Sequence, residues 1–332
     1  MASNLPAAYD IAGRVGACQY AGTVPTPLTS WTASSYFGAW ERVVTGWDSL
    51  IAELAHVEDI AGGRALVWRG VHDASYGLVS SAYRWLKRTN GRNPTEAQLT
   101  SFEQALITTA RRTWPDRGGS ALETLAHIQH YGGPTRLLDV THEPMVAAFF
   151  ATETKFDDAH KRKTDVDGRL FAFDASRSIG LEGVWGSRAL PWGDPTTPIV
   201  GWREQVPFVW DPPSALNERV AAQRGAFLVG GIPSLPKGQN SRYRPPGAWQ
   251  AGNMKTMPTS TVRDLTSVSL WMTNLDKKTR PTSFATYTLR ITQSAKEEIR
   301  GRLRADRDFH HGTMYPDLYG LATFGANLSV TT

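Results

Sequence analysis

Residues 127–141 read HIQHYGGPTRLLDVT, and this stretch decides the fold because it passes from a helix through a tight turn into a strand. The Gly-Gly-Pro turn at 132–134 cannot continue a helix, so we expect the helix that begins at Ser120 to stop at Tyr131. The strand that follows would return the chain toward the helix end. We expect this path to gather four polar side chains in a small volume: His130, Arg136, Asp139 and Thr141.

Three of these side chains allow more than one interpretation. Asp139 and Thr141 precede a helix that starts near residue 143, and either could accept hydrogen bonds from its free N–H groups. Asp139 could also pair with an arginine, and His130 could be a satisfied residue at a helix end rather than a ligand contact. The following helix runs to about residue 154 and is apolar on most sides, which predicts a central place in the core.

Upstream of this stretch, Trp68-Arg69-Gly70 ends a short run that reads as a buried strand from residue 65. The glycine allows the backbone to turn and a ligand to approach closely. A buried guanidinium stays charged, so Arg69 needs an anion. That anion is either the phosphate or carboxylate of a ligand, or a structural partner such as Asp139 or Asp73.

The remaining pattern predicts the order of the elements. Apolar spacing predicts an amphipathic helix from Tyr36 to about Val57, and a second from Pro94, capped by Asn93, to about Thr113. Beyond residue 161 the pattern predicts strands at 168–173, 206–210, 226–229, 267–272 and 286–291, a long loop at 232–258, and a last helix at 293–304. Helices first and strands later favour an α+β fold over a regular βαβ alternation.

Composition limits the class of protein. The single cysteine, Cys18, excludes an internal disulfide and a thiolate-rich metal site. No apolar run approaches the roughly 18–20 residues of a membrane span, and no signal-peptide pattern is present, so we expect a soluble cytoplasmic protein without membrane contact. The net charge of +5 favours nucleic acid or a phosphorylated small molecule as partner, and no oligomeric state is indicated. His310, His311 and Asp317 lack metal-ligand spacing, so we expect no metal site.

Several motifs, in order, resemble the FRG domain, a family named for an aromatic-Arg-Gly motif and known mainly from bacterial and phage proteins. Trp68-Arg69-Gly70 resembles its opening, and the stretch from Gln129 to Thr141 with the following Pro144, Ala147 and Phe150-Ala151 resembles its most specific block. The resemblance covers about residues 40–324. It continues through Tyr83-Arg84, Asn217-Glu218-Arg219, Gln223, Gly225, Phe227 and Tyr315-Pro316-Asp317-Leu318.

The order of these motifs is also similar to the Arg, Ser/Thr, Glu layout of ADP-ribosyltransferases, which hold NAD in the cleft of a split sheet. Asp139-Val140-Thr141 stands where those enzymes carry Ser-Thr-Ser. The similarity implies that Arg69 holds the NAD pyrophosphate and that Glu218 stabilises the ribose cation, with Gln223 as the alternative contact. The implied catalytic residues are Glu218, Arg69 and His130, and the implied NAD contacts are Arg69, Gly70, Tyr83, Arg136, Asp139, Thr141 and Gln223.

These observations give one prediction of fold and two of function. We expect a flexible arm at 1–35, a single FRG domain at 36–325 and a tail at 326–332, with N-terminal helices on a split or strongly bent, mainly antiparallel, ADP-ribosyltransferase-like sheet. The first function is an NAD-dependent ADP-ribosyltransferase-like enzyme, a toxin or phage-defence effector that acts on nucleic acid or protein. The alternative is a non-catalytic nucleotide- or nucleic-acid-binding regulatory module, in which Arg69, Arg136 and His130 contact the ligand and Glu218 is dispensable.

Overall fold

The computed structural model describes residues 32–324 except 116–118, 158–160, 179–181, 194–201, 203–206, 214–215, 234–241, 244–256 and 276–283. The chain divides into residues 1–30 and 31–332, and all described residues belong to the second unit. The predicted tail, most of the predicted arm and most of the predicted 232–258 loop lie outside the described residues. Among the described residues, every helix is too short or too polar to span a bilayer.

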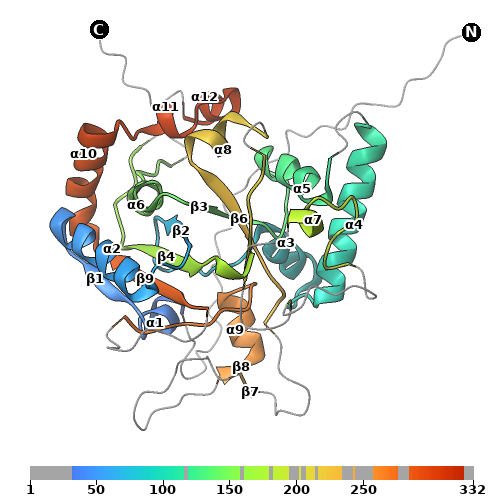
Figure 1. Ribbon diagram of the computed structural model, residues 1–332, viewed down its shortest axis with the longest axis horizontal. Helices are drawn as coiled ribbons and strands as arrows, with labels where there is room; N and C mark the ends of the chain where they lie inside the picture. Colours follow the sequence, from blue (N-terminus) through green and yellow to red (C-terminus); the bar gives the residue numbers. More distant parts are fainter. Residues whose placement is uncertain are drawn as a thin grey trace, which may run out of the picture. The chain divides into compact units, whose positions relative to one another are not determined.

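The described strands form a mixed seven-stranded sheet that is not closed into a barrel, so the expected α+β class is confirmed (Figure 1). The order is β1 (Arg42–Val44), β9 (Thr286–Ile291), β4 (Gly168–Asp174), β2 (Leu66–Val71), β3 (Leu138–Thr141), β6 (Gly225–Val229) and β5 (Phe208–Trp210). The β1 and β9 strands are parallel, and the other neighbours are antiparallel. A separate two-stranded pair joins β7 (Arg242–Tyr243) to β8 (Met257–Pro258).

The sheet is nearly divided between β2 and β3. Strand β2 pairs with β4 from Leu66 to Val71, whereas its pairing with β3 consists of Trp68 opposite Thr141 alone. Beyond that pair the two strands separate, and no further main-chain register joins them. The sheet therefore has a four-stranded part, β1-β9-β4-β2, and a three-stranded part, β3-β6-β5.

Helices cover the four-stranded part on both faces. On one face, α2 (Trp47–Ala61), α6 (Pro144–Thr152) and α10 (Lys296–Arg307) bury a core with alternate residues of β2, β4 and β9. On the other face, α1 (Ala33–Phe37) and α9 (Thr259–Leu265) pack on the intervening residues, among them Val67, Phe171 and Phe173. Because successive side chains of a strand point to opposite faces of the sheet, the same strands contribute apolar residues to both cores.

The three-stranded part has its own covering helices. Helices α4 (Glu96–Thr113) and α5 (Ala121–His130) lie beside it with α7 (Glu182–Trp185), and their core includes Trp185, Trp192, Trp202 and Trp210 (Figure 1). Helix α3 (Ser81–Asn90) packs against α4. Helices α8 (Glu218–Ala222), α11 (His311–Met314) and α12 (Leu318–Phe324) lie close together at one end of the sheet (Figure 1).

Two predicted elements differ from the structure. The predicted helix from Tyr36 is interrupted, because Arg42–Val44 form the edge strand β1 and the helix restarts at Trp47. Branched residues at 43 and 44 favour a strand, and Gly46 separates it from the helix. The predicted strand 267–272 is not a strand, because residues 267 and 268 form a bend and only Met272 makes an isolated bridge, to Thr286.

Candidate functional site

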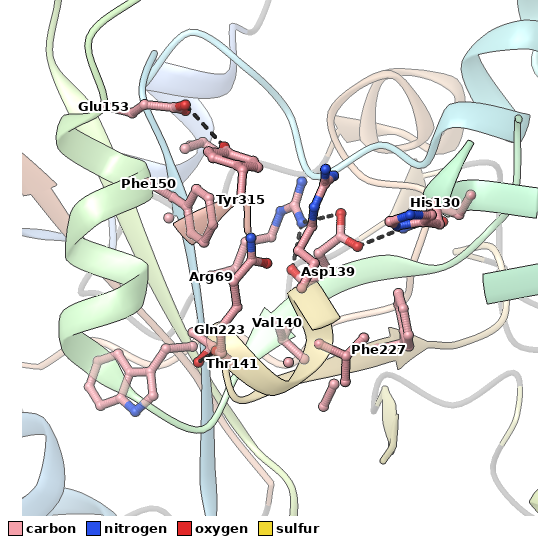
Figure 2. Close-up of a pocket in the computed structure, with 18 of the residues that line it drawn as sticks. Arg69, His130, Asp139, Val140, Thr141, Phe150, Glu153, Gln223, Phe227 and Tyr315 are labelled. Atoms are coloured by element: carbon pink, nitrogen blue, oxygen red, sulfur yellow. Dashed lines mark hydrogen bonds and ion pairs between the residues drawn. The ribbon is translucent and has the colours of Figure 1, made fainter. Parts of the chain in front are cut away.

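A cavity of about 410 Å³ lies where β2 and β3 separate (Figure 2). Its walls come from β2, the end of α5, β3, the end of α6, the segment from Asn217 to Phe227, and Tyr315. Of the predicted site residues, six line it: Arg69, Gly70, His130, Asp139, Thr141 and Gln223. Ligands commonly bind where neighbouring strands of a sheet diverge, because the missing ladder leaves a concave opening with free polar groups.

Arg69 occupies this opening. Its Nη1 donates to the main-chain oxygen of Asp139 at 2.6 Å, while the closest Asp139 carboxylate oxygen is 3.9 Å away. Its Nε is buried and has no hydrogen-bond partner among the described residues, and the side chain is 23% exposed. Burial lowers the pKa of Arg69, Asp139 opposes this shift, and the nearby Arg84 adds to it. The Arg69 guanidinium with its unpartnered donor, together with the positive charge of Arg84 behind it, makes this end of the cavity suited to an anion.

Asp139 points into the cavity from β3 and remains open to solvent, with a side chain 68% exposed. Its Oδ1 accepts a hydrogen bond from Gln129 Nε2 at 2.7 Å, and Gln129 also accepts one from the Thr135 hydroxyl. The carboxylate does not cap the following helix, because Glu143 takes that place by accepting from the N–H of Met145. Asp139 is therefore a positioned, accessible carboxylate.

Thr141 and Gln223 join β3 to the segment before β6. The Thr141 hydroxyl donates to the main-chain oxygen of Gln223 at 2.7 Å and accepts from the N–H of Glu143 at 3.0 Å. The Gln223 side chain lines the cavity and donates through Nε2 to the oxygen of Met314 at 2.7 Å. These bonds fix the floor of the cavity and tie it to α11.

His130 lines the cavity at the C-terminal end of α5. Figure 2 shows its ring on the same side of the cavity as Asp139. Burial lowers the pKa of His130, the charge of Arg219 lowers it further, and Asp317 opposes both. The neutral imidazole is therefore favoured at neutral pH, which leaves it able to accept a proton.

Glu153 is a cavity residue that no sequence motif singled out. It follows α6, is 5% exposed, and accepts from Lys155 Nζ and from Tyr315 Oη at 3.0 Å, with His311 Nε2 3.2 Å away (Figure 2). Burial alone would raise the pKa of Glu153, but the His311 hydrogen bond and the Lys155 charge lower it. Its donors come from positions 155, 311 and 315, so no local pattern signals the cluster.

Arg219 lines the cavity from α8. Its Nε and Nη2 donate to the two carboxylate oxygens of Asp317 at 3.0 and 2.9 Å, and its guanidinium lies 5.0 Å from the centre of the Tyr315 ring. Its neighbour Glu218, the predicted catalytic carboxylate, is exposed and does not line the cavity. Asn217 caps α8, and the first turn then directs Arg219 inward and Glu218 outward.

Two further predicted NAD contacts lie outside the cavity. Tyr83 is fully buried in the α3 core with Leu86 and Leu99. Arg136 is 4% exposed, and its guanidinium donates to both Glu103 oxygens and to Glu96, with the ring centres of Trp192 and Trp202 4.7 and 5.2 Å away. Burial lowers the pKa of Arg136, but Glu103 and Glu96 outweigh it and raise the value. Arg136 is an internal counterion rather than a ligand contact.

Gly70 lines the cavity, but its small size serves the packing of α6. An added Cβ would lie 1.9 Å from the main-chain oxygen of Ala147 and 2.6 Å from the nitrogen of Ala151. Among the described residues, His, Cys, Asp and Glu side chains form no group of three that could hold a metal ion.

Comparison with known proteins gives a family for the part of the chain that supplies most of this site. Residues 64–160 match the FRG domain model, a range that contains Arg69, His130, Asp139, Thr141 and Glu153. Neither the curated proteins nor the solved structures include a match to this chain.

Proposed function

We propose, from the premise that residues 64–160 form an FRG domain, that the cavity binds NAD and that the protein transfers its ADP-ribose group. The observation that carries this proposal is the position of Arg69, which stands in the gap of a nearly divided sheet with a buried Nε that no group of the described residues satisfies. The unpartnered Nε favours a ligand atom that accepts a hydrogen bond.

Phosphate oxygens match the donors at this end of the cavity. Arg69 keeps one edge of its guanidinium free while Nη1 holds the Asp139 main chain, and Arg84 adds positive charge nearby. A diphosphate in the cavity would neutralise the Arg69 guanidinium and supply charge-assisted hydrogen bonds to it. We therefore assign the NAD pyrophosphate to Arg69.

The transfer needs a carboxylate near the ribose, and we assign this role to Asp139 instead of Glu218. In the reaction the bond between ribose C1′ and the nicotinamide nitrogen breaks, and nicotinamide leaves with the electron pair. An acceptor nucleophile bonds to C1′ and gives its proton to neutral His130. Positive charge that develops on the ribose is stabilised by an anion in the cavity. Asp139 offers an exposed carboxylate there, whereas Glu218 faces solvent outside it.

A second candidate function is binding of a nucleotide without turnover. It is favoured by the hydrogen bonding of the cavity carboxylates, since Glu153 faces donors from Lys155, His311 and Tyr315, and Asp139 accepts from Gln129. A carboxylate held by several donors is a weaker base and a better structural anchor. In this case Arg69 would bind phosphate and no bond would break.

Incubation with NAD separates the two functions. We expect the wild-type protein to release nicotinamide or to add mass to a protein, DNA or RNA acceptor. Arg69→Ala should weaken NAD binding about 10- to 100-fold, since it removes charge-assisted hydrogen bonds. Asp139→Asn should keep NAD binding and lower turnover about 100-fold or more.

Two controls complete the experiment. Glu218→Gln should change neither binding nor turnover, and Arg302→Ala removes an exposed arginine of α10 as a matched control for Arg69. Nucleotide binding that depends on Arg69 without any turnover would favour the binding module. Loss of turnover in Glu218→Gln, or binding unchanged in Arg69→Ala, would contradict the assignment of residues.

A further inference from the structure

A line of aromatic rings leads from the surface into the cavity. Tyr131 contacts the His130 ring at 5.0 Å between centres, His130 lies 6.4 Å from Tyr319, and the Arg219 guanidinium lies 5.6 Å from Tyr319 and 5.0 Å from Tyr315. We call Tyr131, His130, Tyr319 and Tyr315 the ring row. It joins the end of α5 to α12, two elements far apart in the sequence.

The outer part of the ring row is open to solvent. Tyr131 is 63% exposed and Tyr319 is 44% exposed, whereas His130 and Tyr315 line the cavity itself. Exposed rings that adjoin the lining of a cavity form a candidate binding surface, whereas singly exposed rings are ordinary. The row is therefore a surface that continues directly into the site described above.

Cations accompany the rings. The Arg219 guanidinium lies over the rings of Tyr315 and Tyr319 and forms an ion pair with Asp317. Arg224, at the cavity edge between Gln223 and Gly225, is 65% exposed and has a single ion pair, 3.4 Å from Glu143. Its φ of 45° is a conformation that residues other than glycine rarely adopt, and such strain is concentrated at functional positions.

We propose that the ring row binds single-stranded nucleic acid, with unpaired bases stacked on Tyr131 and Tyr319 and the strand directed toward the cavity. A polynucleotide repeats a planar ring and an anion, and the row offers rings with interspersed cations, as single-strand binding surfaces do. Duplex bases have no free faces, so a duplex lacks the stacking contribution. Single-strand binding at the ring row does not depend on whether the protein turns over NAD in the cavity.

The exposed side chains of Leu318 and Leu321 on α12 are the strongest argument for a protein partner at the same surface. They do not continue the ring row toward the cavity, since neither lines it. The rings next to His130 and Arg219 fit bases and phosphates better than an apolar helix face. A protein partner is an outcome of the test below.

The test is fluorescence anisotropy of labelled oligothymidylate and oligouridylate about ten nucleotides long, with the matching duplex as comparison. We expect the wild-type protein to bind the single strands more tightly than the duplex. Tyr131→Ala and Tyr319→Ala should each weaken single-strand binding about tenfold, while Tyr131→Phe and Tyr319→Phe should retain it because the ring faces remain.

The matched control is Trp114→Ala, which removes an aromatic residue of similar exposure, 61%, at the end of α4. It should leave binding unchanged, and thermal melts should show that all variants are folded. No binding by the wild-type protein, equal binding of duplex and single strand, or an equal loss in Trp114→Ala would overturn the proposal. NAD binding, measured in the same variants, should not change, so a failure here is distinct from a failure of the proposed transferase.

Discussion

At the scale of single residues, Gly70 lies where helix α6 crosses strand β2. Gly70→Ala should lower the free energy of unfolding by about 2–4 kcal/mol, because the new Cβ would meet the main-chain oxygen of Ala147 at 1.9 Å. That oxygen belongs to a helix held on both sides by the core, so it cannot move aside cheaply. Urea unfolding of the two proteins measures the difference.

Gly301→Ala is the control for this substitution. Gly301 lies inside α10, and an added Cβ there meets nothing within 4 Å. Alanine should raise the free energy of unfolding by about 0.5–1 kcal/mol through its helix propensity. If Gly70→Ala were as stable as the wild type, the close approach of α6 to β2 would be wrong, and the glycine would instead serve the ligand.

Among the single residues, the sequence located Arg69 at the cavity but misplaced Arg136 and Glu218. Arg69 was expected to need an anion, and it stands in the cavity with an unpartnered Nε. Arg136 was given the same role, but its counterions Glu96 and Glu103 come from a helix more than thirty positions earlier. Nothing in the local sequence distinguishes a buried structural arginine from one that faces a cavity. The predicted catalytic residue Glu218 lies outside the cavity because it is one position away from Arg219, the α8 residue that lines it.

At the scale of elements, helix α10 carries a buried lysine against the end of β2. Lys296 is 1% exposed, and its Nζ donates to the main-chain oxygen of His72 at 2.6 Å. Burial lowers the pKa of Lys296 to about 8, with Asp165 opposing that shift and Arg300 adding to it. The unfolded chain therefore binds more protons than the folded one between about pH 8 and the usual lysine value near 10.4.

This difference sets the direction of the pH dependence. When the unfolded state binds more protons, stability rises with pH, so the folded protein should gain about 1–3 kcal/mol across that window relative to Lys296→Met. Urea unfolding of both proteins at several pH values isolates the lysine, because the other groups cancel in the difference. A difference that stays constant from pH 7 to pH 10 would contradict the lowered pKa.

The longer helices and the central strands were both predicted at this scale, since β4, β6 and β9 lie within one residue of the predicted ranges. Helices α4, α5, α6 and α10 lie where apolar spacing and stop signals placed them, although α4 is capped by Thr95 rather than by Asn93. Strand β1 was hidden inside a predicted helix, since Val43 and Val44 satisfy helical spacing as well. Its three residues are extended because they pair with β9, nearly 250 positions later, and local propensity does not report such a partner.

At the scale of the whole described sheet, the site depends on pairings between distant segments. The sequence predicted a split or bent sheet only through resemblance. The split itself arises because β2 and β3 share the single pair of Trp68 and Thr141 while β4 and β6 hold their outer edges. Arg69 then links the two parts through its hydrogen bond to the Asp139 oxygen. The same residue is thus the proposed phosphate contact and a structural bridge between the two parts of the sheet.

This double role leads to a prediction for native-state hydrogen exchange. Amides of β4, paired on both sides within two cores, should exchange only through global unfolding, whereas those of β3 and β6 should open at a free energy about 1–3 kcal/mol lower. Arg69→Ala should lower the opening free energy of β3 and β6 further, because it removes a link between the two parts of the sheet rather than a core contact. The β4 amides should still exchange only through global unfolding. Exchange followed by mass spectrometry after proteolysis, with Arg302→Ala as control, resolves the strands. Equal protection of β4 and β6 in the wild type would mean that the sheet opens as one unit. A loss of NAD binding in Arg69→Ala would then come from the lost ligand contact alone and not from a loosened link between the two parts of the sheet.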